Sequence, residues 1–475
     1  MTSSMPDQET AKYVESTPTS RELQGEAEQY LPGGSSRGTA YFAPYPIFVE
    51  RGEGHYIHDV DGNRYLDFML NATSLIMGHA HPEITRALSE QAAKGVAFSG
   101  PTAVQIRLAE MLCERIPSME LVRFTSSGTE ATLNAIRVAR AYTGKHGIAK
   151  FEGGYHGSHE YASISVHPAA HELDPDGPTA VPEFPGMPPS VAEEVVVLPY
   201  NDLDACETIL GERHKNLACV IMESVVSNFG YAPADICFLR GMRDLTRDLG
   251  ILLVFDEVQS LRIAPGGAQE MFGVEPDLTA LGKIIGGGIP AGAFGGRRDI
   301  MSLFDPGRGA EAIPHAGTFN ANPMTMTAGE TTMRHLTPEV YERMNRLGGM
   351  LRAKLQAVFD EMDMPVQVTG VASFFGIHFT DAPVTDYRSM LAGDQQMTRT
   401  LFTGLLNEGI LLQQSCAGSL STLTTEKHVD GLVAAVRRVV GRIEAKLRGA
   451  PSHTSLLSTG ENGSDPPSLE GRGLK

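Results

Sequence analysis

The chain has 475 residues, of which 41% are hydrophobic and 20% charged, a composition typical of a soluble globular protein with several domain-sized units. Its formal net charge of −18 opposes binding to phosphate backbones and anionic membranes, which argues against a nucleic-acid partner. No run approaches a membrane span, the N-terminus has no signal-peptide pattern, and the five cysteines form no C-x-x-C pair. We therefore expect a cytoplasmic protein with reduced thiols, no membrane partner and no zinc site.

The two ends of the chain are polar and show no regular apolar period. Neither end can bury enough apolar surface to offset its ordering entropy, so we expect residues 1–20 and residues 450–475 to be mobile. After the first of these, the stretch "PIFVERGEGHYIHDVDGNRYLDF" predicts strands joined by a hairpin turn at "VDGN". We assign residues 21–75 to the N-terminal part of a small α+β domain.

The central part of the chain alternates between apolar runs of strand length and helical patterns. The strand-like runs are "LVRF", "ACVIM", "ILLVF" and "AGAFGG". This alternation predicts an α/β fold over residues 76–330, with a mostly parallel sheet covered by helices on both faces. Residues 331–449 begin with a long amphipathic pattern and should complete the small domain. The proline-rich stretch at 171–194 predicts a long loop, which in a compact domain is more often functional than idle.

The most apolar strand, "ILLVF", ends in two carboxylates, Asp256 and Glu257. Ligands of open α/β sheets bind at the carboxyl ends of the strands. A partly buried carboxylate at that place is costly unless it meets a cation or a hydrogen-bond donor. We therefore interpret Asp256 as a ligand contact and assign Glu257 an orienting or structural role.

Two other strand ends supply groups that could share a ligand with Asp256. The stretch "TSSGTEA" opens a helix with small hydroxyl residues and Gly128, and free N–H groups at a helix start favour phosphate. The stretch "GKIIGGG" places Lys283 among glycines that allow a ligand to approach the backbone. Pyridoxal phosphate (PLP) requires these parts, because a lysine forms a Schiff base with its aldehyde and a carboxylate keeps its ring nitrogen protonated.

Each of these motifs also has an ordinary structural interpretation. "GGG" is more often a plain loop, "TSSGTE" is more often a helix cap, and most lysines are solvated surface charges. "YHGSHE" has a His and a Glu at helical spacing, but no second cluster supports a metal, so we expect none. The order of the motifs along the chain is what favours the cofactor.

In that order, "TSSGTEA", "GGYHG", "MESVVSN", "VFDEVQSLR", "LGKIIGGGIPAGAFGGR" and "HAGTFNANPMTM" resemble the class III aminotransferase family of fold type I PLP enzymes. The resemblance runs from about "LPGGSSR" to the final helix. "GNRYLDF" and "GHAHPEI" are similar to glutamate-1-semialdehyde aminomutase and its relatives that transaminate β-amino acids. The resemblance implies a large domain on a mostly parallel, seven-stranded-type sheet, a smaller α+β domain, and a homodimer with active sites at the interface.

The resemblance also assigns roles to individual residues. Lys283 would be the Schiff-base lysine and Asp256 the partner of the ring nitrogen. The residues that it implies for the phosphate are Ser127, Gly128 and Thr129, with Thr318 reaching in from a second subunit.

The remaining cofactor contacts follow from the same resemblance. Tyr155 would stack on one face of the ring, Val258 would pack on the other, and Gln259 would contact the ring hydroxyl. Glu223 and Asn228 of "MESVVSN" would complete the cofactor site.

Several positions depart from the family pattern. Ser224 follows Glu223 where the family usually has Pro, and Gln259 stands where the aminomutases usually have Met. Arg37 stands where β-amino-acid aminotransferases place the arginine that grips the substrate carboxylate, whereas Ala40 replaces the aminomutase arginine.

The segment "QQSCAGSLS", residues 413–421, is a further departure. It lacks the switching arginine of β-phenylalanine-type enzymes and the glutamate of the aminomutases, and Ser415 or Cys416 occupies that place. Arg37 is then the obvious partner for a substrate carboxylate, and its ordinary alternative is a surface guanidinium after a Gly-rich turn. Arg262 could swing in and supply a second positive charge.

These observations favour an aminotransferase that moves an amino group from a β-amino acid or bulky amine to an oxo acid in a ping-pong cycle. The alternative on the same scaffold is an aminomutase of the glutamate-1-semialdehyde type or an amino-acid racemase, neither of which needs an external acceptor. A third alternative, from another class, is a cofactor-binding regulator without turnover. Such regulators usually carry a basic DNA-reading domain, and the N-terminus offers none.

Overall fold

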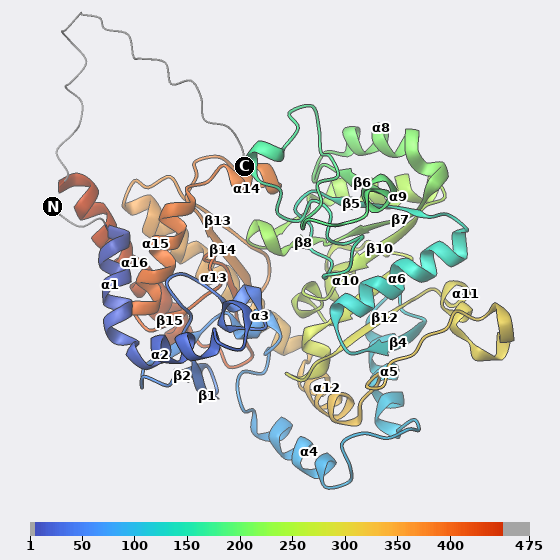
Figure 1. The fold of residues 1–475 in the computed structure, drawn as a ribbon, viewed down its shortest axis with the longest axis horizontal. Coiled ribbons are helices and arrows are strands. Elements are labelled where there is room, and N and C mark those ends of the chain that lie inside the picture. The colour runs from blue at the N-terminus through green and yellow to red at the C-terminus, as the bar shows by residue number, and fades with distance from the viewer. Residues whose placement is uncertain (1–4, 450–475) are drawn as a thin grey trace, which may run out of the picture.

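The computed structural model describes residues 5–449, which form two lobes (Figure 1). The lobe on the right of the view contains a seven-stranded sheet, and the lobe on the left combines the N-terminal elements with most of the C-terminal ones. No helix within this described range is long and apolar enough to cross a membrane.

The seven-stranded sheet is the framework of the larger lobe. It is parallel except for β12, which pairs antiparallel with both of its neighbours, so the expected mostly parallel sheet is confirmed. In sheet order its strands are β4 (Leu121–Thr125), β12 (Gly292–Gly296), β11 (Leu278–Gly282), β10 (Leu252–Asp256), β7 (Leu217–Met222), β5 (Gly147–Phe151) and β6 (Val195–Leu198).

Helices cover both faces of this sheet because its central strands are apolar on both sides. Every residue of β10 is buried, and its successive side chains point to opposite faces. Val254 joins the hydrophobic cluster under α6, whereas Leu253 and Phe255 join the cluster under α8 and α9. The helices of this region are α4 (Pro82–Ala92), α5 (Ala103–Arg115), α6 (Gly128–Thr143), α7 (Pro189–Glu194), α8 (Leu203–Arg213), α9 (Ile236–Asp248), α10 (Gly267–Phe272), α11 (Arg298–Met301) and α12 (Pro323–His335).

The smaller lobe joins the two ends of the chain. The predicted hairpin at "VDGN" is present, with β2 and β3 antiparallel, and β15 from the C-terminal part extends the same sheet in parallel with β3. This pairing agrees with a small domain built from residues 21–75 and 331–449, although the boundaries themselves stay a prediction. The strands outside the large sheet are β1 (Val49–Glu53), β2 (Tyr56–Asp59), β3 (Arg64–Asp67), β8 (Val225–Val226), β9 (Ala232–Pro233), β13 (Gln367–Thr369), β14 (Phe374–His378), β15 (Ile410–Leu411) and β16 (Gly418–Ser419).

The remaining helices lie mainly in and around this smaller lobe. They are α1 (Met5–Ser16), α2 (Pro18–Ala27), α3 (Leu70–Thr73), α13 (Pro338–Glu361), α14 (Tyr387–Leu391), α15 (Gln395–Asn407) and α16 (Glu426–Gly449). Short 3-10 helices occur at Pro32–Gly34, Gly38–Ala40, Ala170–Glu172, His214–Asn216, Ser227–Phe229, Ser260–Ile263, Lys283–Gly286, Ser302–Phe304 and Pro306–Glu311.

The N-terminal segment corrects the expectation that residues 1–20 are mobile. Helix α1 packs along α15, as the two blue and orange helices on the left of Figure 1 show. Tyr13 is only 1% exposed, and its hydroxyl group donates a hydrogen bond to the carbonyl of Tyr45 at 2.8 Å. Glu9 of the same helix is also buried and pairs with Arg442 at 2.9 Å, so one aromatic and one charged anchor hold a helix whose composition is otherwise polar. The expected mobile tail at 450–475 and residues 1–4 lie outside the described residues.

Candidate active site

Three strand ends meet at the carboxyl edge of the large sheet. Asp256 ends β10 and pairs in register with Ala280 of β11, so Lys283 follows three positions beyond that pair at the same edge. Strand β4 ends at Thr125, and Ser127 is the N-cap of α6. The sheet therefore brings together the carboxylate, the amine and the helix start that the sequence predicts.

Asp256 is held by two hydrogen bonds in a nearly closed environment. The carboxylate is 5% exposed, and it accepts a hydrogen bond at 3.0 Å from the backbone N–H of Val258. Its other oxygen lies 2.9 Å from Nδ1 of His156, which is only 1% exposed. Burial lowers the pKa of His156, although Asp256 opposes that effect, so the neutral ring donates from Nδ1 to the carboxylate. His156 thereby orients Asp256.

Lys283 follows β11 with a backbone φ of 50°, in the left-handed region that non-glycine residues seldom adopt. Backbone strain of this kind is concentrated at functional sites. Burial lowers the pKa of the Lys283 amine, and the nearby Asp256 and Glu223 carboxylates partly oppose this effect. Such an amine gives up its proton more readily than a surface lysine, as a nucleophile must.

Glu223 is a second buried carboxylate beside Asp256. It accepts hydrogen bonds from the backbone N–H of Tyr155 at 3.2 Å and from the hydroxyl group of Ser227 at 3.0 Å. Burial and the neighbouring Asp256 raise the pKa of Glu223 to about 8. Glu223 thus fixes the backbone of Tyr155, whose ring is 43% exposed and free to cover a ligand.

The start of α6 has the features of a phosphate site. Its first backbone N–H groups, at Gly128 and Thr129, have no acceptor one turn earlier in the helix. A Cβ atom at Gly128 would lie 3.1 Å from the methyl groups of Val258, and one at Gly282 would lie equally close. Val258 therefore occupies the space that side chains at both glycines would need, while its packing on a bound ring stays a prediction. Ser127 accepts a hydrogen bond from the backbone N–H of Glu130 at 3.2 Å.

Glu257 has the structural role that the sequence suggested. It is fully buried and accepts backbone hydrogen bonds from Ala268 at 2.6 Å and Gln269 at 3.1 Å, at the start of α10. Ser260 and the Gln269 amide also donate to it. The two carboxylates after β10 thus differ in their contacts, since Asp256 bonds to His156 and Val258, whereas Glu257 holds the start of α10.

Gln259 and Asn228 are held at the edge of the site. Thr73 and Tyr231 both donate hydrogen bonds to Oε1 of Gln259, at 3.4 Å and 3.2 Å. Asn228 donates to the carbonyl of Gly153 at 2.9 Å and so supports the loop that carries Tyr155 and His156.

The proline-rich stretch 171–194 ends in the short helix α7 and is therefore not the continuous loop that the sequence predicted, and it reaches this edge of the site at one point. Its Glu183 lies 2.7 Å from Nδ1 of His167, and the other ring nitrogen of His167 lies 3.3 Å from the Asn228 amide. The loop is thus connected through His167 to a predicted cofactor contact, while its functional role stays a prediction.

Arg37 lies in an exposed position, with its guanidinium donating to Oδ1 of Asn71 at 2.6 Å. Asn71 belongs to α3, a left-handed turn in which Leu70, Asn71, Ala72 and Thr73 have φ values of 48°, 50°, 53° and 72°. Because Thr73 also contacts Gln259, this turn connects Arg37 to the edge of the site.

The structure argues against a swinging Arg262. Its side chain is fully buried and donates to the Thr73 carbonyl at 2.8 Å, to the Ser419 hydroxyl group at 2.9 Å and to the Leu420 carbonyl. These bonds join the two lobes and would have to break together. Cys416 is also buried, in the core of the smaller lobe, with its thiol against the Thr398 carbonyl at 3.2 Å.

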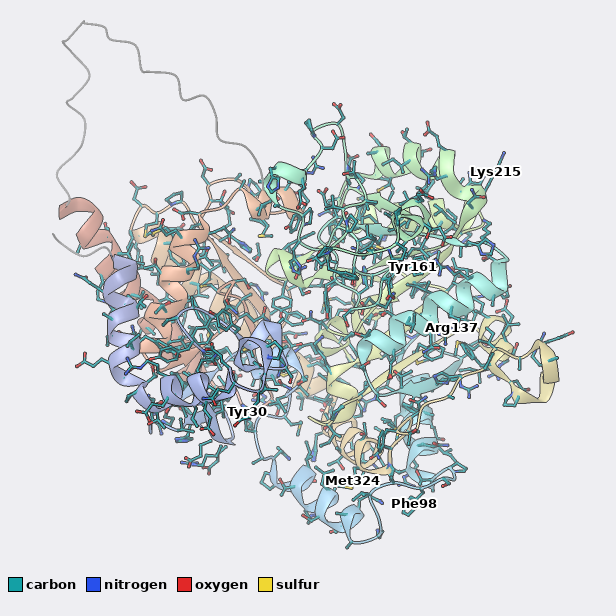
Figure 2. All side chains as sticks on the ribbon, in the orientation of Figure 1. Tyr30, Phe98, Arg137, Tyr161, Lys215 and Met324 are labelled. Atoms are coloured by element: carbon teal, nitrogen blue, oxygen red, sulfur yellow. The ribbon has the colours of Figure 1, made fainter. Side chains whose placement is uncertain are left out.

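Thr318 lies apart from this cluster. It lines a surface cavity of about 580 Å³ together with Phe98, Ser99 and Pro323. Figure 2 shows Phe98 beside Met324 of α12 at the lower edge of the larger lobe. The placement is compatible with a contact to another subunit, which stays a prediction.

The residues present fit PLP. Nε2 of His156 is buried and has no hydrogen-bond partner within residues 5–449, so this ring is bound through Asp256 alone. No cluster of three or more His, Cys, Asp or Glu side chains suited to a metal ion occurs in the same range. His156 is the residue to which the sequence assigned no role, although it stands in "GGYHG". Its position next to Tyr155 was the available signal.

Comparisons with known proteins agree with this geometry. Residues 39–433 match the profile of the family described as aminotransferase class-III. Among curated proteins, the chain is similar to glutamate-1-semialdehyde 2,1-aminomutase from Methanothermobacter thermautotrophicus, with 40% identity over 429 residues that cover 90% of this chain and 99% of the relative.

Solved structures are similar over nearly the same length. An omega-transaminase from Sphaerobacter thermophilus matches with a TM-score of 0.86 at 45% identity, covering 89% of this chain and 97% of its own. A β-phenylalanine aminotransferase from Variovorax paradoxus matches with a TM-score of 0.83 at 36% identity, covering 93% and 98%. A transaminase with PLP bound matches with a TM-score of 0.85 at 36% identity, covering 91% and 99%.

Proposed function

Since the chain belongs to the aminotransferase class-III family of fold type I PLP enzymes, we propose that it moves an amino group on a carboxylated substrate at the carboxyl edge of its large sheet. The observation that carries this proposal is the meeting of Lys283, Asp256 and the start of α6 at that edge. PLP, when bound, supplies an electron sink for the negative charge that develops on the substrate carbon.

The residues of the site divide the work of this reaction. Lys283 holds the cofactor and then carries the proton at the substrate carbon, because its amine is partly desolvated. Asp256, oriented by His156, keeps a proton on the ring nitrogen. Gly128, Thr129 and the Ser127 hydroxyl would hold the phosphate at the start of α6.

Two forms of amino-group transfer fit this site, and the comparisons back an aminomutase better. An aminomutase moves the amino group within one substrate, as the name of the curated relatives says of glutamate-1-semialdehyde. Such a reaction needs no second oxo acid and therefore no additional cation for a distal carboxylate. The structure offers no second cation at these two positions, because Cys416 carries a buried thiol and Arg262 is held by its bonds to Thr73 and Ser419.

The second form is transfer from a β-amino acid or bulky amine to an external oxo acid, which the sequence favoured. Similarity to the omega-transaminase and to the β-phenylalanine aminotransferase supports it. The exposed guanidinium of Arg37, beside the turn that contacts Gln259, supports it as well, because it could bind the carboxylate of a β-amino acid.

The requirement for an external acceptor separates these candidates. Glutamate-1-semialdehyde is supplied alone to the PLP-loaded protein, and β-phenylalanine is supplied with and without pyruvate. An aminomutase converts the first substrate without an acceptor, whereas an aminotransferase gives sustained turnover of the second only with pyruvate. If PLP binds but its absorbance changes with neither glutamate-1-semialdehyde nor β-phenylalanine, both forms of the reaction would be contradicted and a binding protein would be favoured.

We also propose that the protein forms a homodimer and is cytoplasmic. Phe98, which lines the Thr318 cavity, is 51% exposed, and Ile106 and Phe319, which follow the lining residues Gln105 and Thr318 in sequence, are 65% and 61% exposed. Exposed apolar residues gathered in this way are typical of a subunit interface. Thr318 would then reach the phosphate of the partner's site.

A further inference from the structure

Tyr231 is a buried residue in a strained conformation at the boundary of the two lobes. Its side chain is fully buried, and its backbone φ of 63° lies in the left-handed region. Its ring stacks on Phe374 of β14, with centroids 4.1 Å apart and an interplanar angle of 6°. Strained backbone conformations that are maintained by close packing are concentrated at functional sites.

The hydroxyl group of Tyr231 has two different partners. It accepts a hydrogen bond from Nε2 of Gln413, in the segment that lacks the family's arginine and glutamate. It donates its own proton to Oε1 of Gln259 at 3.2 Å. Gln413 donates to the phenolic oxygen of Tyr231, so the hydroxyl proton of Tyr231 is left to be donated elsewhere. Oε1 of Gln259 accepts it.

Thr73 repeats this arrangement from another direction. It has a left-handed φ of 72°, and its hydroxyl group donates to the same Oε1 atom at 3.4 Å. Its carbonyl group is in turn held by the buried Arg262 at 2.8 Å. Thr73 and Tyr231, two strained residues from distant parts of the chain, therefore both hold the carbonyl oxygen of the Gln259 amide.

We propose that Tyr231 is a positioning residue that fixes the Gln259 amide so that Nε2, a hydrogen-bond donor, faces the ring oxygen of the cofactor. This inference rests on the proposed function, in which Gln259 contacts that oxygen. With Oε1 occupied by two hydroxyl groups, Nε2 is the part of the amide that can serve a ligand. A donor at this position stabilises the negatively charged form of the ring oxygen.

Gln413 extends the arrangement into the smaller lobe. It lies within the 413–421 segment, and Ser419 of the same segment accepts a hydrogen bond from Arg262 at 2.9 Å. The segment therefore supports Gln259 through Tyr231 and supports Thr73 through Arg262. The charged groups near Tyr231 are Arg262 and Glu223.

The test is a pH titration of the absorbance of the bound cofactor in the holoenzyme, which does not depend on turnover. In Tyr231→Phe the amide keeps only the longer bond from Thr73 and can turn Oε1 toward the ring oxygen, so we expect the absorbance midpoint to rise by about 1 pH unit. Tyr13→Phe, which removes another buried hydroxyl group far from the site, should leave the midpoint unchanged. In a Gln259→Ala background, adding Tyr231→Phe should cause no further shift.

An unchanged midpoint in Tyr231→Phe, or an equal shift with and without Gln259, would overturn this inference alone. Failure of the unmodified chain to bind PLP would overturn the proposed function with it. Should Tyr231→Phe not fold, Thr73→Val removes the second donor and should also raise the midpoint, with Thr73→Ser as its matched control. A Thr73→Val midpoint equal to that of Thr73→Ser would then overturn the inference.

Discussion

Nδ1 of His156 lies 2.9 Å from Oδ2 of Asp256, and both side chains are almost completely buried. The pair is formed across 100 positions of the chain, between the loop after β5 and the end of β10. Burial lowers the pKa of His156, so the neutral ring serves as a donor that orients the Asp256 carboxyl group. An oriented carboxyl group at this position is what the protonated ring nitrogen of PLP requires.

Replacing His156 should slow the reaction while PLP remains bound. In His156→Ala, Asp256 loses the hydrogen bond that orients it. We expect kcat to fall about tenfold to a hundredfold. His156→Gln, which retains an N–H donor, should recover part of the rate. Asp256→Asn, measured beside them, should lose more than either. Equal kcat values for His156→Ala and the unmodified enzyme would remove His156 from this role.

The buried Glu223 gives a prediction about pH and stability. Its pKa is raised from 4.5 to about 8 in the folded chain, so the folded state binds this proton more tightly than the unfolded state between those values. Stability contributed by this group is therefore present at low pH and is lost as the pH rises from about 4.5 to about 8.

Glu223→Gln should remove this dependence in the PLP-free protein. We expect the difference in Tm between Glu223→Gln and the unmodified protein to move in favour of the variant as the pH is raised across that window. Glu207→Gln, at an exposed position of α8, is the matched control and should follow the unmodified protein. A constant difference in Tm between Glu223→Gln and the unmodified protein at all pH values would show that folding leaves the pKa of Glu223 unchanged.

Thr318 tests the proposed subunit interface. Thr318→Ala should weaken PLP retention, because one phosphate contact is lost. If the contact crosses the interface, a mixed dimer of Thr318→Ala and Lys283→Ala subunits should contain one intact site and recover activity. Mixed dimers that are shown to form but have no recovered activity would place Thr318 in the site of its own subunit.

Arg37 tests how substrate carboxylates are bound. We expect Arg37→Ala to raise the KM for carboxylated substrates about tenfold or more and to leave simple amines unaffected, because only the former use its bidentate donors. Arg51→Ala, another exposed arginine, is the control. If an external acceptor is used, pyruvate should give a higher kcat/KM than 2-oxoglutarate, since Arg262 is committed to the Thr73 and Ser419 bonds. A clear preference for 2-oxoglutarate would contradict this interpretation of the pocket.

The strand ends were predictable from the sequence because they follow from local pattern and one rule of sheet topology. Asp256 follows the fully apolar run "ILLVF", Lys283 follows the buried strand "LTALG", and parallel strands bring such ends to one edge. The antiparallel direction of β12 was not predictable, because "AGAFGG" is a short apolar run that carries no direction.

Contacts between distant segments were beyond local pattern. The hydrogen bonds of Tyr231 with Gln259 and Gln413 span 28 and 182 positions, and neither leaves a periodic signal. The order of helix α1 was not predictable for a related reason, since its anchors are Tyr13 and the pair of Glu9 with the distant Arg442, and its sequence has no apolar stripe. In both cases the conformation depends on a packing partner that is distant in sequence, and local sequence patterns do not indicate such a partner.

The most direct test of the central claim asks which lysine holds PLP. The PLP-loaded protein is reduced with borohydride, digested and mapped by mass spectrometry. We predict the label on Lys283 alone and no labelled peptide in Lys283→Ala. The natural competitor is Lys150 in β5, which is fully buried and whose pKa burial lowers to about 7. Label on Lys150, or on any lysine other than Lys283, would contradict the site described for this protein.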